Sequence, residues 1–398
     1  MATRHGGLHI QVGGKAAVTL FALSLVGFVA ESQLTQYVQT NLGYRQPYLI
    51  FYIVHSSFAI TLPLHLVLLA ITAGKSPREL WSLLMTTLRQ HLSPPGVRST
   101  EFPRRRLAWL LTFLTIASNI PGLLWFMAVS LAPMTDITAL WNTNAFFAYL
   151  LSVRVFKLKW EPIRLAAVVL ATLGATVVVY GGSSSKPDAP EAVAHRAANN
   201  RAPLAGDLLT LAGSVLYAMY QVFYKLYAAL PTDPEELFDA EPAGPYTRIP
   251  TESELEEDDA LEPAQGTIVP PFGLFPNMLT SFIGICTFLL LWIPIPILQF
   301  LGVAHFALPT TRAQILSIVG ISLTGVTFNA GFMILLGIWG PIVTSVGSLL
   351  TIAMMFVSDM IFGGAAGSVT VWSLLGSGAI VVAFCVLAYD IAKRKHPA

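Results

Sequence analysis

The stretch Leu165–Val179 reads LAAVVLATLGATVVV and contains no charged, amide or aromatic side chain. It does not alternate between apolar and polar residues, as the strands of a membrane β-barrel do. It is also longer than such strands, which take about 9–11 residues. Only helices and closed barrels satisfy all their backbone hydrogen bonds within lipid. The stretch therefore predicts a membrane-spanning helix.

The composition extends this prediction to the rest of the chain. Hydrophobic residues make up 54% of the 398 residues and charged residues 11%, whereas a soluble domain has about 25% charged residues. The mean hydropathy is +0.65. Because a spanning helix needs about 20 apolar residues, we predict an all-helical membrane protein. Its ten predicted spans cover residues 16–38, 47–73, 107–131, 134–153, 163–181, 204–228, 271–299, 313–337, 341–362 and 370–390.

Basic residues divide unequally between the two sides of this arrangement. Eighteen of the 23 Lys and Arg residues fall on the side that holds both termini. Cytosolic loops carry the excess of Lys and Arg in membrane proteins. The pattern therefore predicts a cytosolic N-terminal segment at 1–15 and a basic cytosolic tail at 392–398.

The loop at 231–265 has a composition of its own. Twelve of the 22 acidic residues lie between Asp233 and Glu262, and such a segment has too little apolar surface to fold. We predict a disordered cytosolic loop. Within it, Tyr246–Ile249 (YTRI) fits a tyrosine-based sorting signal, which makes a trafficking adaptor a candidate partner.

Two further segments separate the predicted spans. Residues 182–203 are predicted to form a lumenal linker. Residues 76–103 hold apolar side chains at helical spacing (Leu80, Trp81, Leu84 and Leu88). Such a helix either lies on the membrane surface or is an ordinary loop helix.

The two halves of the chain are predicted to be inverted repeats, at 16–181 and 204–391. Pro133 opens one span and Tyr180 closes the next, 47 residues later; Pro341 and Tyr389 do the same 48 residues apart. The last helix of each half contains glycine, at Gly174 and at Gly376 and Gly378. Because five spans precede the second half, it runs in the opposite direction, which is a transporter design.

Three stretches resemble the drug/metabolite transporter superfamily. Gly206–Tyr227 (GDLLTLAGSVLYAMYQVFYKLY) resembles its sixth helix, with a Tyr-Ala-x-Tyr core before a Lys. Thr344–Asp359 (TSVGSLLTIAMMFVSD) resembles the ninth helix of its EamA-like and solute-carrier-family-35 F-type members. Ser130–Tyr180 resembles their fourth and fifth helices. The likeness covers residues 107–390 well and the first two spans weakly.

The resemblance implies ten helices in two inverted five-helix repeats and transport of a small solute in an endomembrane such as the Golgi or vacuole. Two departures limit it. Ala353 stands where the family has Pro, so the kink expected there is in doubt. Lys157 and Leu158 stand where it often has Gly-Glu, so no role of that glutamate carries over.

Acidic residues and histidines within spans are candidates for proton coupling, because charges at depth are costly and mark pathways. Glu31 lies in the lumenal third of its span, near the polar residues Ser32 and Thr35. Asp359 and His55 are the other candidates. Alternatively, Asp359 lies among lipid headgroups and His55 bonds a carbonyl. Asp136 and His65 are weaker candidates, Asp136 because it also suits a helix cap.

Polar and aromatic residues within spans are candidates for solute binding. One helical face in 204–228 gathers hydroxyl, amide and amine groups from Tyr217, Tyr220, Gln221, Tyr224 and Lys225, at spacings that share a face. Alternatively, the tyrosines form an interface belt and Lys225 extends to the membrane surface. Three amides could line the same cavity or bridge helices: Asn119, Asn142 and Asn329.

These features predict a secondary transporter of a small polar organic solute, nucleotide-sugar-like or metabolite-like, driven by protons or by exchange. The alternative is a membrane receptor or scaffold that acts through the acidic loop. No phosphate-binding loop and no HExxH or GxSxG motif occurs, so neither ATP hydrolysis nor enzymatic activity is expected. Cys286 and Cys385 lie within spans and lack metal-ligand spacing. No metal, cofactor or nucleic-acid partner is expected.

Overall fold

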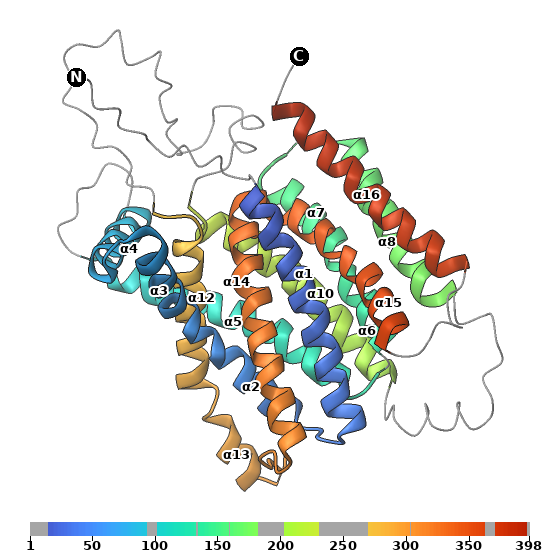
Figure 1. Cartoon of the computed structure of the whole chain (residues 1–398), viewed down its shortest axis with the longest axis horizontal. Coiled ribbons are helices and arrows are strands. Elements are labelled where there is room, and N and C mark those ends of the chain that lie inside the picture. The colour runs from blue at the N-terminus through green and yellow to red at the C-terminus, as the bar shows by residue number, and fades with distance from the viewer. Residues whose placement is uncertain are drawn as a thin grey trace.

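The computed structural model of the protein describes residues 15–93, 102–132, 134–158, 160–181, 203–230, 270–302, 304–362 and 371–395. The predicted linker, the acidic loop at 231–265 and the signal at Tyr246–Ile249 lie outside the described residues. Within the described ranges every regular element is a helix (Figure 1). The helices are α1 (Lys15–Gln36), η1 (Tyr37–Asn41), α2 (Pro47–Ser56), η2 (Ser57–Ile60), α3 (Thr61–Ala73), α4 (Pro77–Leu92), α5 (Arg104–Val129), α6 (Met134–Asn142), α7 (Asn144–Val155), α8 (Pro162–Gly181), α10 (Pro203–Tyr227), α12 (Leu274–Leu290), α13 (Pro294–Phe300), α14 (Arg312–Ser348), α15 (Leu350–Phe362) and α16 (Val371–Lys395).

Five helical stretches of the described part are long and apolar enough to cross a membrane. They are Ala16–Asn41, Pro47–Ala73, Arg104–Val129, Leu274–Phe300 and Arg312–Ser348. The prediction of an all-helical membrane protein is therefore confirmed. The other predicted spans are helical too, and two of them, in α8 and α16, contain shorter apolar stretches at Pro162–Gly174 and Leu374–Leu387.

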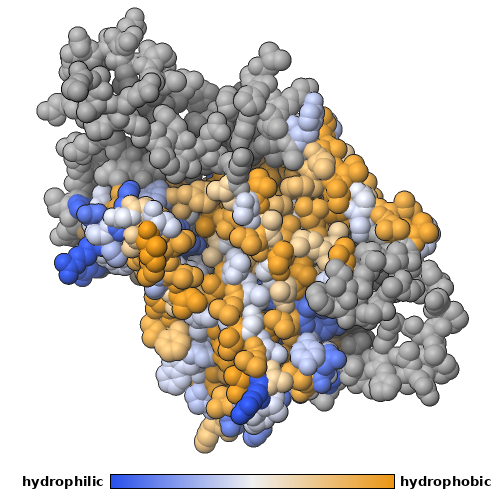
Figure 2. Space-filling model, in the orientation of Figure 1, coloured by the Kyte–Doolittle hydropathy of each residue, from blue (hydrophilic) through white to orange (hydrophobic). Residues whose placement is uncertain are grey.

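The protein exposes many large apolar side chains and also buries several polar ones. Val18, Trp109 and Leu316 are 59%, 76% and 70% exposed, whereas Thr210 and Gln221 are fully buried. On the face seen in Figure 2, hydrophobic residues cover the sides of the helices and hydrophilic ones gather toward their ends. Such a surface suits a lipid environment, where polar groups find partners only inside the protein.

The second long stretch, Pro47–Ala73, is bent at a 3₁₀ turn, η2. Pro63 lacks the N–H that would bond the carbonyl of Ala59. That carbonyl instead accepts a hydrogen bond from Ser281 Oγ of α12, 2.7 Å away. The bend therefore fixes α12 against this stretch.

α14 contains a break that divides it into two parts. Its 37 residues would extend about 56 Å at 1.5 Å per residue, far beyond a hydrocarbon core of about 30 Å. At Gly340 the backbone leaves the helical region, with φ 73° and ψ 172°, and Pro341 follows. In Figure 1 the ribbon of α14 rises beside α1, and after the break the chain descends into α15.

Glycines let α1 and α14 pack closely along their length. A Cβ atom on Gly27 would stand 3.1 Å from the carbonyl oxygen of Thr324, and one on Gly325 would stand 3.0 Å from Glu31 Oε1. A Cβ on Gly331 would overlap Ser24 Oγ. Small residues at helix interfaces allow this approach in membranes. We call this contact the glycine seam.

The remaining helices pack in pairs around this seam. α10 packs along α5, α12 packs on α2, η2 and α3, and α8 packs on α16. The pair α8 and α16 forms one edge of the molecule in Figure 1. These pairings bring helices from distant parts of the chain around a common centre.

The amphipathic helix predicted within 76–103 is α4. A capping box starts it, with Ser76 and Glu79 each accepting a hydrogen bond from the other's backbone N–H. Its face of Leu80, Leu84 and Leu88 is buried in a core cluster shared with α5, α10 and α12. This face therefore packs on the helix bundle.

Candidate functional site

α10 turns its polar face inward. Tyr220, Gln221 and Tyr224 are at most 4% exposed, while Leu204 and Leu208 on the same helix are 71% and 59% exposed. Lipid solvates the leucines, and the polar groups must find partners inside the protein. The face predicted from the sequence therefore lies at the centre of the bundle.

Aromatic rings line a small cavity at this centre, with room for about one water molecule. They come from α1, α6, α10 and α14: Phe28, Trp141, Tyr217, Phe328 and Phe332. The rings form a continuous row. Trp141 stacks on Tyr217 with centroids 5.0 Å apart, and Tyr217 lies 5.7 Å from Phe332. Phe328 joins Phe332 to Phe28, at 5.3 Å and 4.9 Å.

Three uncharged polar residues complete the cavity lining: Asn142, Ser348 and Thr351. Each already donates to a carbonyl of its own segment. Asn142 Nδ2 bonds Thr138 at 2.7 Å. Ser348 Oγ bonds the carbonyl of Ser345, and Thr351 Oγ1 bonds that of Ser348, both at 2.6 Å. Their oxygen atoms thus remain as hydrogen-bond acceptors for a molecule in the cavity.

A buried hydrogen-bond network adjoins the cavity. Gln221 of α10 donates to Asn144 Oδ1 of α7 at 3.3 Å, and its own Oε1 accepts from Ser345 Oγ of α14 at 2.5 Å. Asn144 in turn donates to the carbonyl of Trp141 at 2.7 Å. The network fixes Trp141 in the cavity wall through three helices. Gln221, a predicted binding residue, thus acts on the cavity through its neighbours.

Lys225 lies apart from the cavity lining and supports the break in α14. Pro341 has no N–H to donate to the carbonyl of Gly337. Lys225 Nζ donates to that carbonyl at 2.8 Å. The buried ammonium therefore has a backbone partner where the sequence suggested a phosphate or carboxylate of the solute.

Tyr220 and Tyr224 follow Tyr217 along α10 without lining the cavity. The Tyr220 hydroxyl donates to Met333 Sδ at 3.2 Å. The Tyr224 hydroxyl is buried, and no described residue bonds it. Both rings belong to the core cluster that also contains the leucines of α4.

Glu31 lies one helical turn beyond the cavity wall. On α1 it follows Phe28 by three residues, and it contacts Gly325, which precedes Phe328 by three residues on α14. It is 5% exposed, and no basic side chain of the described residues lies within ion-pair distance. Glu31 is therefore a buried acid beside the cavity.

Further along α1 and into η1, a row of polar atoms leads away from Glu31. Ser32 Oγ, Thr35 Oγ1 and Gln39 Oε1 are buried, and no described residue bonds them. Their spacing places them on one side of the helix. On α14, Ser322 Oγ is also buried, and no described residue bonds it.

The two histidines of the second long stretch have neighbours of their own. His55 packs against Phe51 and Phe58, with ring centroids 4.3 Å and 4.8 Å apart. His65 Nδ1 lies 2.8 Å from Asn277 Nδ2 of α12. Neither lines the cavity.

The other predicted amides differ in position. Asn142 lines the cavity, but Asn119 bridges α5 to α12 by bonding Thr287 Oγ1 at 2.8 Å. Asn329 donates to the carbonyl of Gly325 on its own helix at 2.9 Å. The side chains of Asp136 and Asp359 lie outside the described part of the structure.

In the connection from α7 to α8, Lys157 and Leu158 stand where the resemblance predicts Gly-Glu. Lys157 adopts a left-handed conformation, with φ 53°. The N–H of Leu158 then bonds the carbonyl of Val153 at 3.1 Å, which closes the helix end. The backbone of Lys157 therefore has a conformation that glycine adopts more readily than other residues.

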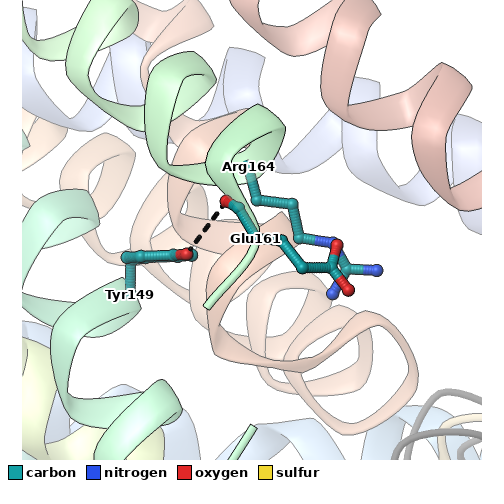
Figure 3. Close-up of polar contacts among 3 residues, drawn as sticks. All are labelled: Tyr149, Glu161 and Arg164. Atoms are coloured by element: carbon teal, nitrogen blue, oxygen red, sulfur yellow. Dashed lines mark hydrogen bonds and ion pairs between the residues drawn. The ribbon is translucent and has the colours of Figure 1, made fainter. Parts of the chain in front are cut away.

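A glutamate does occur near this connection. Figure 3 shows Glu161 between Tyr149 of α7 and Arg164 of α8. Arg164 Nε lies 3.1 Å from Glu161 Oε2, and the Tyr149 hydroxyl donates to the carbonyl of Glu161 at 3.3 Å. These contacts hold the start of α8 against α7 and leave the central cavity untouched.

The aromatic cavity wall was missed at the level of the sequence. Of its five rings, Tyr217 alone was predicted as a binding residue. The available signals were adjacency and spacing: Trp141 precedes Asn142, and Phe328 and Phe332 share a face beside Asn329. Phenylalanine is common in membrane helices, so these signals do not separate cavity walls from lipid contacts.

Comparison with known proteins adds a likeness of fold. No protein-family model matches the chain, and no curated protein matches it. Among solved structures, 25 chains match. One of them, described only as the crystal structure of a protein, covers 94% of this chain and 99% of its own length, with a TM-score of 0.50 and 14% identity.

Proposed function

We propose that this protein is a multi-pass secondary transporter that moves a small organic solute by alternating access. The observation that carries the proposal is the small cavity between the helices of the bundle. Its lining combines aromatic rings with a few polar groups and comes from both halves of the chain, as expected for a transporter site. In this conformation the cavity is nearly filled, so solute entry requires the surrounding helices to separate.

The helix pairings support two inverted five-helix repeats. If α1 corresponds to α10, and α5 to the first part of α14, then the packing of α1 on α14 has its counterpart in the packing of α10 on α5. α8 and α16 correspond to each other and pack together. A Cβ on Gly174 of α8 would stand 2.8 Å from the carbonyl oxygen of Gly376 on α16.

Matching tightened turns give further support. At Thr143, between α6 and α7, the N–H bonds the carbonyl of Leu140, three residues back. At Leu349, between α14 and α15, the N–H bonds the carbonyl of Val346 in the same way. Both residues keep helical backbone angles. Asn142 and Ser348, each adjacent to one tightened turn, line the cavity.

The finer features of the proposal follow from the sequence. They are ten spans, cytosolic termini, membership of the EamA-like drug/metabolite transporters and residence in an endomembrane. Glu31 is the proposed proton-coupling group, since it is a buried carboxyl group beside the cavity and acids at membrane depth mark pathways. Asp359 and His55 remain candidates from the sequence.

Flux into liposomes tests the proposal. The purified full chain, reconstituted with a panel of labelled organic solutes, is expected to catalyse saturable uptake of one chemical class. Asn142→Ala and Trp141→Ala should reduce that uptake at least tenfold, while Trp109→Ala, on the exposed face of α5, should leave it unchanged. Equal uptake by Trp141→Ala and the wild type would show that the solute does not bind in this cavity.

A further inference from the structure

We infer that a line of bound water molecules runs along α1 and η1 and connects Glu31 to the surface of the protein. The role of this water as a proton route to Glu31 rests on the proposed transport function. The inference follows from buried polar groups that the described helices leave without partners, from their position beside Glu31, and from the exposed residues near which they end.

Ser32 and Thr35 depart from the usual behaviour of hydroxyl groups in helices. A serine or threonine inside a helix commonly donates to the carbonyl four residues before it. Ser24 Oγ and Thr40 Oγ1, on the same helical stretch, do so at 2.8 Å and 2.6 Å. The hydroxyls of Ser32 and Thr35 are buried, and no described residue bonds them. They therefore remain open to another molecule.

The facing helix, α14, contributes a third hydroxyl of this kind. Ser322 Oγ is buried, and no described residue bonds it. Ser322 precedes Gly325 by three residues and shares its face, which contacts Glu31. A Cβ atom on Gly320 would stand 3.0 Å from Leu34 of α1. Ser322 thus lies between two contacts with α1, at the level where the open hydroxyls of α1 begin.

Water is the ligand that suits these groups. Each buried polar group without a partner costs about 1–3 kcal/mol, and a bound water that makes about two to four hydrogen bonds removes this cost. Glu31, Ser32 and Thr35 lie within about 100° of one another around α1. Because water both donates and accepts, it can bond hydroxyl, carboxyl and amide groups in turn.

The row ends at η1, near the surface. Gln39 follows Glu31 by eight residues, about 12 Å at 1.5 Å per residue. Its Nε2 bonds the carbonyl of Phe126 at 3.5 Å, and its buried Oε1 is not bonded by any described residue. Arg45 Nε donates to the backbone carbonyl of Gln39 at 3.4 Å, and Asn41 is exposed. The polar row therefore leads from the buried carboxyl group to exposed residues.

Hydrogen exchange at introduced thiols tests for this water directly. Ser32→Cys and Thr35→Cys, in a protein with Cys286→Ala and Cys385→Ala, each place one S–H group in the row. Infrared spectroscopy follows its conversion to S–D after transfer of the purified protein to heavy water. We expect exchange about tenfold faster than at Leu25→Cys, a buried apolar position in the same α1–α14 contact. Equal rates at the two kinds of position would overturn the inference.

Thr35→Val provides a second measurement, whose sign differs between a hydrated and a dry contact. Valine has nearly the shape of threonine but lacks the hydroxyl. If Thr35 bonds water, the variant loses a hydrogen bond, and its melting temperature should fall. In a dry contact the variant loses only an unpaired hydroxyl, and its melting temperature should rise. A rise would overturn the inference even if the cysteine variants do not fold.

Flux into liposomes distinguishes this inference from the proposed function. Thr35→Val should lower uptake driven by a proton gradient about fivefold, as expected for the loss of one hydrogen bond. Ser24→Ala, whose native hydroxyl bonds within its own helix, should leave uptake unchanged. Fast thiol exchange without flux of any solute would retain the water and contradict the transport function. Proton-driven uptake that Thr35→Val leaves unchanged would retain transport and overturn the proton route.

Discussion

The carbonyl of Gly337 illustrates how one residue determines the role of another. Pro341 leaves this carbonyl without its helical donor, and the α14 break leaves it buried inside the protein. Lys225 reaches it at 2.8 Å from the neighbouring helix. The sequence shows the lysine and the proline but not their juxtaposition, so Lys225 suggested a ligand for the solute.

Replacement of this lysine by an apolar residue of similar length tests its structural role. Lys225→Met keeps the aliphatic contacts but leaves the Gly337 carbonyl unbonded, which should lower the free energy of unfolding by about 1–3 kcal/mol. Thermal unfolding of the purified protein measures the effect. Lys75→Met, at an exposed position, is the control. An unchanged melting temperature for Lys225→Met would contradict the role.

A second prediction at this scale concerns Lys157, with its φ of 53°. A left-handed conformation costs a non-glycine residue roughly 1–2 kcal/mol, and glycine in turn has about 0.5–1 kcal/mol of extra chain entropy to lose. Lys157→Gly should therefore stabilise the protein by about 0.5–1 kcal/mol. Lys157→Ala, which retains the Cβ, should not. Equal melting temperatures for the two variants would contradict this account.

At the scale of elements, the sequence predicts the helices far better than their interruptions. The second span, predicted at 47–73, appears at Pro47–Ala73, because its apolar length is a property of composition. Its 3₁₀ turn was not predicted, although Pro63 offers a cause. The tightened turn at Thr143 contains neither Gly nor Pro. Thr143 Oγ1 instead lies 3.0 Å from Ser214 Oγ of α10, a tertiary contact that no local pattern reveals.

For the candidate site too, local sequence patterns predict some features, and tertiary contacts decide the others. Helical spacing correctly groups the polar side chains of α10 on one inward face, but it does not distinguish Tyr217, in the cavity wall, from Tyr224, in the core. That distinction depends on which neighbouring helix approaches each residue. Asn119 and Asn142 look alike in sequence and differ for the same reason, since only Asn119 faces Thr287.

The contact of α4 with the end of α10 leads to a pH prediction. His91 Nε2 lies 3.0 Å from the carbonyl of Tyr227, the last residue of α10. Burial lowers the pKa of His91 below its ordinary value of 6.5, although this carbonyl acts in the opposite direction. The unfolded chain therefore binds the proton more readily, so stability falls as the pH drops below 6.5.

His91→Gln retains an N–H donor for the carbonyl and removes the titration. Melting temperatures of the variant should fall less than those of the wild type between about pH 6.5 and pH 5. Above this range the two proteins should respond to pH alike. A variant that loses as much stability as the wild type would exclude His91 as a source of the effect.

At the scale of the whole molecule, the described helices surround the cavity without any part of the acidic segment 231–265. The segment joins α10 to α12, and its composition predicts disorder. Deletion of residues 231–262 should therefore leave solute flux within about twofold of the wild type, since loop length has little influence on a packed fold. Lost flux in a folded, correctly located variant would favour the receptor or scaffold alternative.

The glycine seam has a mechanical consequence. Gly27, Gly325 and Gly331 hold α1 and α14 so close that a methyl group would not fit without displacement of a neighbour. Two helices interlocked in this way are expected to move as one body, although they belong to opposite halves of the sequence. If the protein works by the alternating access that we propose, the surface between its moving parts does not follow the boundary between the proposed repeats. We expect that surface to pass between the α1–α14 pair and the helices that carry Trp141 and Tyr217, so that each opening of the cavity separates the row of rings.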